Sequence, residues 1–392
     1  MRPLVSLVMM IKDEAKSLRG VLESVKPFVD RWTIVDTGSR DDSCRIVKEV
    51  MVSVPGWLHH EQFRGYAATR NRVLDLDAQV TDPSEFSLFL SGDEYLRDGA
   101  KLREYLETQR DTNVDCHFIR LALDMGMSMQ ARVLRTGSKW RYDDFDLGIH
   151  EVPVYPGGAD APKGASPGGY IEHVAADPIA RMDNIWEKHI PLLRAALERN
   201  PKNERALEFL ISSLESFLPH METDECKDTV EECLELYRQR FELPFVCEEQ
   251  RRIFVMRMID TARLGDSFTP EELFIMADKL CQADASRPEP FFLRAVIAST
   301  CPSKLTSDVY SFAREATVVA EKVRGQGGLT NSSPLDMSTE WKAHRLAAIA
   351  AANLAKKYPE NLLLAKDHIA AGLAVGGPWM AFKSILDAEA TP

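Results

Sequence analysis

Hydrophobic and polar positions alternate in two different ways along this chain, and the change falls near residue 175. Before it, short apolar runs that end in polar residues predict buried strands, and apolar residues at helical spacing predict helices. We expect strands at 5–11, 32–38 and 87–93, and helices at 16–28 and 41–51. Strand and helix in turn at this spacing indicate βαβ units and a mostly parallel, Rossmann-like sheet.

The segment from 115 to 155 is more strand-like than helical. Three segments predict an added antiparallel part of the sheet: CHFIRLAL (116–123), ARVLRT (131–136) and EVPVY (151–155). PGGADAPKGASPGGY (156–170) follows and is crowded with Gly, Pro, Ala and Ser. Such a composition cannot bury a core, so we expect a flexible loop there.

From about residue 178 onward the pattern is helical. Three stretches each predict a helix, a turn containing proline and a second helix, at 185–217, 272–300 and 344–375. This is typical of tetratricopeptide-like repeats, which stack helix pairs and present a concave surface to a partner. The predicted fold class is therefore an α/β domain at 1–175, containing the 156–170 loop, followed by an all-α helical-repeat domain at 176–392.

Composition narrows the class of protein. The chain of 392 residues is long enough for two or three domains, and 45% hydrophobic with 28% charged residues is normal for a globular protein. The apolar run 4–11 is too short to span a bilayer and no basic region precedes it, so we expect no membrane insertion and a cytoplasmic protein, or one in the host cytoplasm if it is viral. The seven cysteines form no Cys-x-x-Cys pair. A net charge of −12 argues against coating nucleic acid but leaves a local basic groove open.

Polar residues lie at the carboxyl end of each of the three predicted strands, at 12–14, 36–39 and 93–94. Ligands of such sheets lie beyond the carboxyl ends of the strands, so these residues predict one pocket. Asp36 could accept hydrogen bonds from a ribose or base, or form part of the cap of the helix that follows. Asp93 and Glu94 offer the oxygen ligands that Mg²⁺ or Mn²⁺ needs, or could form a solvated turn.

Two further groups could carry chemistry. Arg70 and Asn71 lie where a helix is expected to begin, and the arginine could face a phosphate or form a surface ion pair. His150 and Glu151 could place a general base beside an acceptor hydroxyl, or a ligand beside a metal. His173 follows the glycine-rich segment, where a closing lid would carry a ligand.

Five segments, taken in chain order, resemble glycosyltransferase family 2. They are SLVMMIKDEAKSLRGVLESVKPFVDRWTIVDTGSRDDSCRIVKE, ATRNRVLD, FLSGDEYL, LGIHEVPVY and IEHV. The resemblance covers about residues 3 to 215 and is nearest to bacterial and viral members in which a nucleotide-sugar domain precedes tetratricopeptide-like helices. It implies a GT-A fold, a nucleoside-diphosphate sugar as donor, most simply a UDP-sugar, Mn²⁺ or Mg²⁺, and transfer with inversion.

The resemblance also implies roles for particular residues. The family's metal motif Asp-Ala-Asp-Glu falls on 91–94, so Ser91 replaces the first Asp, while Asp93 keeps the carboxylate that touches the metal. His173 would complete the metal site. Glu151 would be the catalytic base beside His150, with Asp144 or Asp146 as alternatives. The donor-binding residues would be Lys12, Asp13 (where the family has Asn), Glu14, Asp36, Arg70, Asn71, Ser91 and Asp93.

The acceptor hydroxyl could belong to a glycan, a protein or a modified nucleic acid base. We expect the helical domain to select the acceptor or to form a homodimer, and the 156–170 loop to fold over the donor. A different class is a non-catalytic scaffold with a degraded metal motif, which Ser91 favours. A nucleotidyltransferase would need a glycine-rich basic loop after the first strand, and KDEAKS (12–17) is not such a loop.

Overall fold

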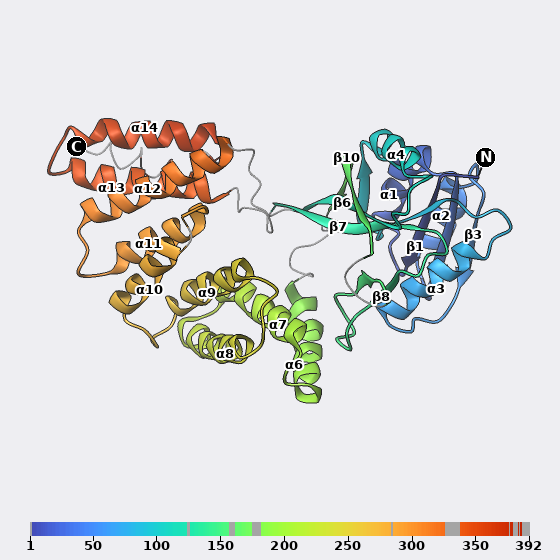
Figure 1. Ribbon diagram of the computed structural model, residues 1–392, viewed down its shortest axis with the longest axis horizontal. Coiled ribbons are helices and arrows are strands. Elements are labelled where there is room, and N and C mark those ends of the chain that lie inside the picture. Colours follow the sequence, from blue (N-terminus) through green and yellow to red (C-terminus); the bar gives the residue numbers. More distant parts are fainter. Residues whose placement is uncertain are drawn as a thin grey trace. The chain divides into compact units, whose positions relative to one another are not determined.

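The computed structural model (Figure 1) describes residues 2–123, 126–156, 161–174, 182–283, 285–325 and 338–375, with 377, 378, 383 and 385. The chain forms two compact units, Met1–Arg199 and Asn200–Pro392. The first unit is α/β and the second is helical, which confirms the expected fold class. None of the described helices combines the length and the apolar composition that crossing a bilayer requires.

The first unit contains an eight-stranded sheet in the order β3-β2-β1-β4-β7-β6-β10-β5. Four of its seven strand pairings are parallel, so the sheet is mixed. The βαβ units predicted from the sequence form the parallel half, and the region after residue 115 adds the antiparallel part as a hairpin. The strands of the parallel half are β1 (Val5–Ile11), β2 (Arg31–Asp36), β3 (Gly56–His60) and β4 (Phe86–Phe89); the others are β5 (Glu94–Arg97), β6 (Cys116–Leu123), β7 (Gly126–Arg135) and β10 (Lys163–His173). Two short strands, β8 (Arg141–Asp143) and β9 (Val152–Val154), form a separate pair.

Helices cover both faces of the parallel half, and the alternation of side chains along β1 explains why. Leu7 and Met9 pack in one core with α1 (Leu18–Val25) and α2 (Ser43–Val50). Val8 points to the other face and packs in a second core with α3 (Tyr66–Ala78). A strand buried on both faces reads as a continuous apolar run, as VSLVMMI does.

The prediction of a flexible loop at 156–170 is wrong for its second half, because β10 runs from Lys163 to His173; residues 157–160 lie outside the described part. The small residues serve close packing rather than mobility. A Cβ atom on Gly164 would lie 2.4 Å from the Tyr105 hydroxyl of α4 (Gly99–Thr108). Gly169 has a φ of 76° and lies where the pairing with β6 changes register. Glycine in a strand commonly marks such a bulge or a close approach.

The division between the units lies after the helical segments η2 (Ile185–His189) and α6 (Ile190–Arg199), later in the chain than the expected boundary at 175/176. These segments belong to the first unit. The guanidinium of Arg199 donates a hydrogen bond to the carbonyl of Asp146, at 2.8 Å. This contact ties the end of α6 to the loop before Glu151.

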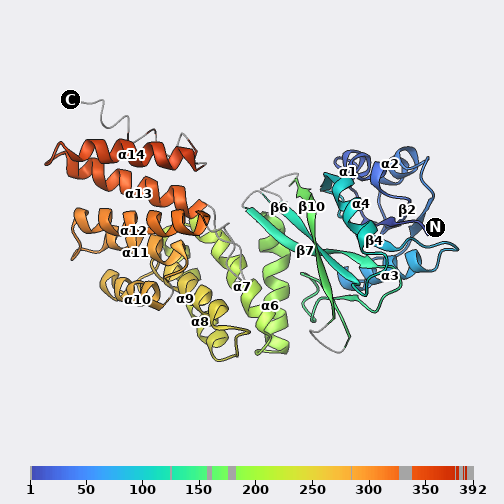
Figure 2. The same cartoon turned by 45° about the horizontal axis from the view of Figure 1, so that its top comes forward.

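The second unit is a run of helices in which each packs against the next (Figure 2). The expected helix pairs at 272–300 and 344–375 correspond to α10 with α11 and to α13 with α14. Buried alanines, Ala295, Ala313 and Ala347, let three of these helices approach closely. The helices are α7 (Glu204–Phe217), α8 (Thr223–Phe241), α9 (Glu248–Ala262), α10 (Pro270–Ala283), α11 (Pro288–Thr300), α12 (Thr306–Gly325), α13 (Ser338–Ala355) and α14 (Asn361–Ala374).

Candidate functional site

The loop after β1 is joined to the loop after β2 by hydrogen bonds. The Asp13 backbone N–H donates to Ser39 Oγ at 3.0 Å, and Asp13 Oδ1 accepts from the Arg40 N–H at 2.7 Å. Asp13 has a φ of 54°, in the left-handed region that Asn and Asp tolerate better than other side chains. This conformation explains how Asp13 can stand where the resembling family has Asn. Lys12, beside it, is exposed.

Glu14 links this loop to the turn after β4. Its backbone N–H donates to Ser43 Oγ at 2.8 Å. Its side chain lies against Gly92, where an added Cβ would meet Glu14 Cδ at 2.6 Å. Burial raises the pKa of Glu14, and the negative charges of Asp93, Asp41 and Asp13 raise it further. Like charges therefore gather at this edge of the sheet, and a cation there would offset their repulsion.

Asp93 and His173 meet at the same edge, although 80 positions separate them in the sequence. His173 Nε2 lies 3.1 Å from Asp93 Oδ2, and both side chains are partly exposed. The pairing of β10 with β5 sets His173 opposite Glu94, and the Val174 N–H donates to the Asp93 carbonyl at 3.1 Å. One carboxylate oxygen and one imidazole nitrogen, beside the negative charge of Glu14, form a donor set that fits Mn²⁺ or Mg²⁺ with positions left for a phosphate.

Glu94 has a different environment from Asp93. It is 2% exposed, and its Oε1 accepts a hydrogen bond from Arg132 Nη2 at 2.6 Å. Its Oε2 accepts from the Ser91 backbone N–H at 2.8 Å. The two neighbouring carboxylates therefore point to different places: Glu94 fixes the 91–94 turn from within, and Asp93 stays accessible.

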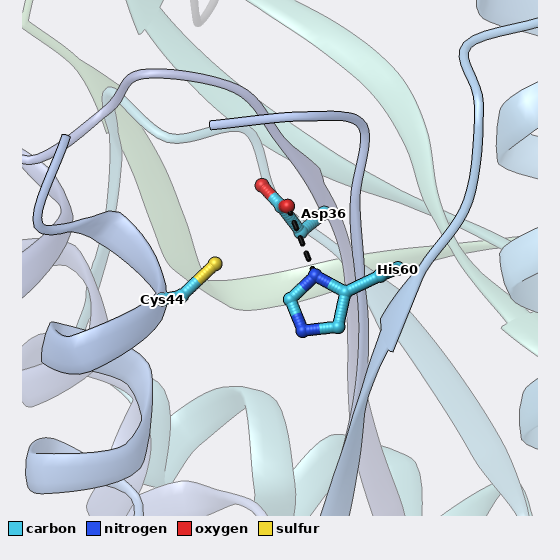
Figure 3. Close-up of side chains that lie close together, drawn as sticks. All are labelled: Asp36, Cys44 and His60. Atoms are coloured by element: carbon cyan, nitrogen blue, oxygen red, sulfur yellow. Dashed lines mark hydrogen bonds and ion pairs between the residues drawn. The ribbon is translucent and has the colours of Figure 1, made fainter. Parts of the chain in front are cut away.

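Asp36 ends β2 and is 4% exposed. Its carboxylate accepts hydrogen bonds from the Ser39 N–H at 3.0 Å and the Gly38 N–H at 3.3 Å, and lies 3.1 Å from His60 Nδ1 (Figure 3). Burial alone would raise the pKa of Asp36, but the hydrogen bonds from Ser39, His60 and Gly38 outweigh it and lower that pKa. The carboxylate is therefore held ionised at the end of the strand, and its contact with a nucleoside stays a prediction.

Arg70 and Glu151 form an ion pair that is largely buried. Arg70 Nε lies 2.6 Å from Glu151 Oε1, and the guanidinium carbon lies 4.1 Å from the centroid of the Phe89 ring. Phe89 is the last residue of β4, so the pair lies close to the turn that carries Asp93. The amide of Asn71 exchanges two hydrogen bonds with the backbone of Tyr142, both at 2.8 Å. These bonds hold α3 to the β8 strand, and donor binding by Asn71 stays a prediction.

The loop before Glu151 carries unusual backbone conformations. Phe145, Asp146 and His150 have φ values of 52°, 64° and 59°. The His150 ring packs edge-on against His189, with centroids 5.5 Å apart. Non-glycine residues in this region cost energy and cluster at functional sites. Of the two alternative bases, Asp146 is exposed and Asp144 is half-buried.

Three residues near the site were not identified from the sequence: Arg132, Cys44 and His60. His60 ends β3, whose half-exposed pattern GWLHH gave no strand signal. The strand pairing sets Asp36 opposite His60, which brings the imidazole to the carboxylate. Two adjacent histidines soon after a predicted strand and helix were the signal that could have been used.

No protein-family model matches the chain. A TPR repeat-containing protein of Synechococcus elongatus is 37% identical over 92 residues, which are 24% of this chain and 21% of that protein. The match therefore spans about a fifth of that relative's length. TarS 1–349 of S. aureus in complex with UDP-GlcNAc has a TM-score of 0.34 and 12% identity, over 83% of this chain and 92% of that chain. GalNAc-T7 with UDP, GalNAc and Mn²⁺ has a TM-score of 0.24 and 12% identity, over 40% of this chain and 30% of that chain. Such low scores do not establish a shared fold, so the site is interpreted from its own residues.

Proposed function

We propose that the protein is a glycosyltransferase that moves a sugar from a nucleoside-diphosphate donor, a UDP-sugar in the first instance, to an acceptor hydroxyl. The observation that supports it most is the contact between Asp93 and His173, 3.1 Å apart, beside Glu14 at the carboxyl end of the parallel strands. The resemblance to glycosyltransferase family 2, which comes from the sequence alone, assigns a metal to the same two residues. Two separate considerations therefore lead to one site.

In this proposal Asp93 and His173 hold Mn²⁺ or Mg²⁺. The cation, when bound, neutralises the charge that builds on the leaving diphosphate. Asp36 accepts hydrogen bonds from the nucleoside, with Lys12, Asp13 and Ser91 along the same edge. Burial and the repulsion from Asp93, Asp41 and Asp13 raise the pKa of Glu14, and a divalent cation would also relieve that repulsion.

Glu151 is the proposed base. It takes the proton from the acceptor hydroxyl, whose oxygen bonds to the anomeric carbon on the face opposite the diphosphate. The bond from that carbon to the diphosphate oxygen breaks, its electron pair leaves with the diphosphate, and the configuration inverts. Arg70 holds the carboxylate through the 2.6 Å ion pair. His150, packed against His189, fixes the backbone next to it.

In this proposal the helical unit selects the acceptor or forms a homodimer. In that unit α11 contacts both α9 and α13 across the intervening helices. Residues of these three helices line a cavity of about 590 Å³ with apolar, basic and acidic side chains, among them Met256, Phe292, Arg257, Lys342 and Glu289. A cavity of this size suits part of a peptide or glycan, so these remain the first acceptors to examine, with a modified nucleobase third.

Donor binding is the experiment that tests the proposal. Thermal unfolding of the full chain is measured with a panel of UDP- and GDP-sugars, each with and without Mn²⁺. A donor at about 100 times its Kd stabilises the folded state by about 2.7 kcal/mol. We expect metal-dependent stabilisation by one donor in the wild type and in Asp111→Ala, an exposed aspartate of the same unit, and none in Asp93→Ala.

Two outcomes would overturn the proposal. Stabilisation by no donor, with or without Mn²⁺, would favour the scaffold function instead. Equal metal-dependent stabilisation in Asp93→Ala would place the donor elsewhere. If donor binds, release of UDP is compared between the wild type and Glu151→Gln; turnover that survives the substitution would remove Glu151 as the base.

A further inference from the structure

Asp36, Cys44 and His60 bring a carboxylate oxygen, a sulfur and an imidazole nitrogen together at the end of β2 (Figure 3). These ligand atoms all lie within 4.8 Å of one another. We propose that the three residues form a binding site for a borderline-soft divalent cation, with Zn²⁺ as the natural probe, and that a cation there blocks the nucleoside end of the donor site. The first half stands on these residues alone, and the second half rests on the proposed function.

The fold fixes the three ligands on three different elements. Asp36 and His60 are register partners at the ends of adjacent parallel strands, and His60 Nδ1 already lies 3.1 Å from Asp36 Oδ2. Cys44 lies in the first turn of α2, which packs on the core through Ile46, Val47 and Val50. The Ser39 and Gly38 N–H groups hold the carboxylate. Little ordering is therefore needed when a cation binds.

The donor set selects the kind of cation. One thiolate, one imidazole and one carboxylate suit Zn²⁺, whereas Mg²⁺ and Mn²⁺ prefer oxygen ligands. The His60 side chain is 62% exposed, which leaves room for a solvent molecule as a fourth ligand. Three protein ligands with one open position is the arrangement found in catalytic zinc sites. The sulfur also distinguishes this trio from the proposed Asp93 and His173 site, which has none.

Binding has to displace a proton. Burial raises the pKa of the Cys44 thiol, and the charge of Asp36 raises it further. At neutral pH the sulfur is therefore protonated, and the S–H proton passes to the solvent as the bond from sulfur to metal forms. The affinity should rise with pH for this reason. The cation also replaces the hydrogen bond between His60 and Asp36.

The consequence for the donor follows from Asp36. The same carboxylate is proposed to accept hydrogen bonds from the nucleoside, and a cation that binds its oxygens removes that acceptor. Zn²⁺ and the nucleotide should then exclude each other, while Mn²⁺ at Asp93 should favour the nucleotide. The two cations would have opposite effects at two ends of one site.

Co²⁺ is the probe for the site itself, because a bond from thiolate to cobalt gives a charge-transfer absorption band in the near ultraviolet. The full-length protein is titrated with Co²⁺ in a non-chelating buffer with a phosphine reductant, and Zn²⁺ is then added to displace the cobalt. We expect the band in the wild type and in Cys247→Ala, which removes an exposed cysteine, and no band in Cys44→Ala. His60→Ala should bind at least tenfold more weakly. Circular dichroism confirms that each variant is folded.

The absence of a thiolate band in the folded wild type, or an unchanged band in Cys44→Ala, would overturn the site. The competition is measured separately, as the ratio of UDP affinities with and without Zn²⁺ within each variant. We expect Zn²⁺ to lower the affinity at least tenfold in the wild type and to have little effect in Cys44→Ala. A band without competition would overturn the blocking. A band in a protein that binds no nucleotide would leave the cation site standing and refute the proposed function.

Discussion

Glu94→Gln tests whether the carboxylate next to Asp93 supports the site from within. Glu94 is 2% exposed, and its partner Arg132 is 9% exposed. Their atoms approach to 2.6 Å. Glutamine has nearly the same shape and still offers an oxygen to the Ser91 N–H. The substitution therefore removes a charge while it leaves the volume and the turn hydrogen bond in place.

The expected loss of stability follows from the burial of the Glu94–Arg132 ion pair. Removing one member of a buried ion pair leaves the other charge uncompensated, which costs about 3–5 kcal/mol. We expect the lower end, about 3 kcal/mol, because the glutamine oxygen keeps the Ser91 N–H bonded and only Arg132 loses its acceptor. For a unit of about 200 residues this is a fall in Tm of about 6–12 °C.

Differential scanning calorimetry of the full chain measures the effect, with Glu104→Gln, an exposed glutamate on α4, as the matched control. The control should stay within about 0.5 kcal/mol of the wild type. Donor affinity in the presence of Mn²⁺, measured well below the Tm, should also fall, because the 91–94 turn sets Asp93 against His173. A Glu94→Gln protein that unfolds like the control would refute the conclusion that the buried ion pair of Glu94 with Arg132 stabilises this unit.

Three further predictions concern the two units. Gly164→Val should destabilise the first unit by about 1–3 kcal/mol in urea unfolding, because a Cβ there meets the Tyr105 hydroxyl. A stability equal to that of the wild type would contradict the packing explanation for this glycine. Asp77→Ala should lower the free energy of unfolding by about 3 kcal/mol, and Asp77→Asn should lower it by less. Only alanine leaves the hydroxyls of Ser6, Thr33 and Ser87 without their shared acceptor. Equal losses of stability in the two variants would contradict this explanation. Burial and the adjacent His368 lower the pKa of His344 to about 4, so the unfolded chain gains a proton that the folded one excludes. The free energy of unfolding should fall by about 1.4 kcal/mol per pH unit from about pH 6.5 toward 4, and a His344→Gln variant with the same pH slope would contradict this.

The elements that the sequence predicted well are those whose signal is local. VSLVMMI is buried on both faces, and the strand found there has the expected bounds, Val5–Ile11. The helix expected at 16–28 is present as α1 with its four apolar residues buried. Here neighbouring side chains along the chain decide the conformation, so spacing alone was enough.

The elements that were missed depend on distant partners. β3 is half-exposed, so its composition resembles that of a loop, and it is a strand because β2 pairs with it. Residues 163–170 have the composition of a flexible loop, but β6 and α4 lie against them and require small side chains. Composition records how small the residues are and does not record what lies beside them.

The residues of the candidate site also divide into those that the sequence could group and those that only distant strand pairings bring together. The residues after β1, β2 and β4 could be grouped from the sequence, because the ends of parallel strands share an edge. The meeting of Asp93 with His173 was implied by the family resemblance and not by spacing, since the pairing of β5 with β10 brings it about. The separate environment of Glu94 depends on Arg132 from β7, a strand that lies later in the chain and pairs with β6 and β4.

The position of Asp36 links the two proposals. Its carboxylate is buried and held by two backbone N–H groups, so it cannot turn away to serve two ligands at once. His60, which is exposed and bonded to it, is the group that can move aside. A nucleoside would displace that histidine, whereas a soft cation would recruit it together with Cys44. In the proposed scheme the state of His60 therefore decides which ligand Asp36 accepts. His60→Ala should weaken the cation at least tenfold while donor binding persists, and equal losses of both ligands would show that His60 supports Asp36 rather than choosing between them.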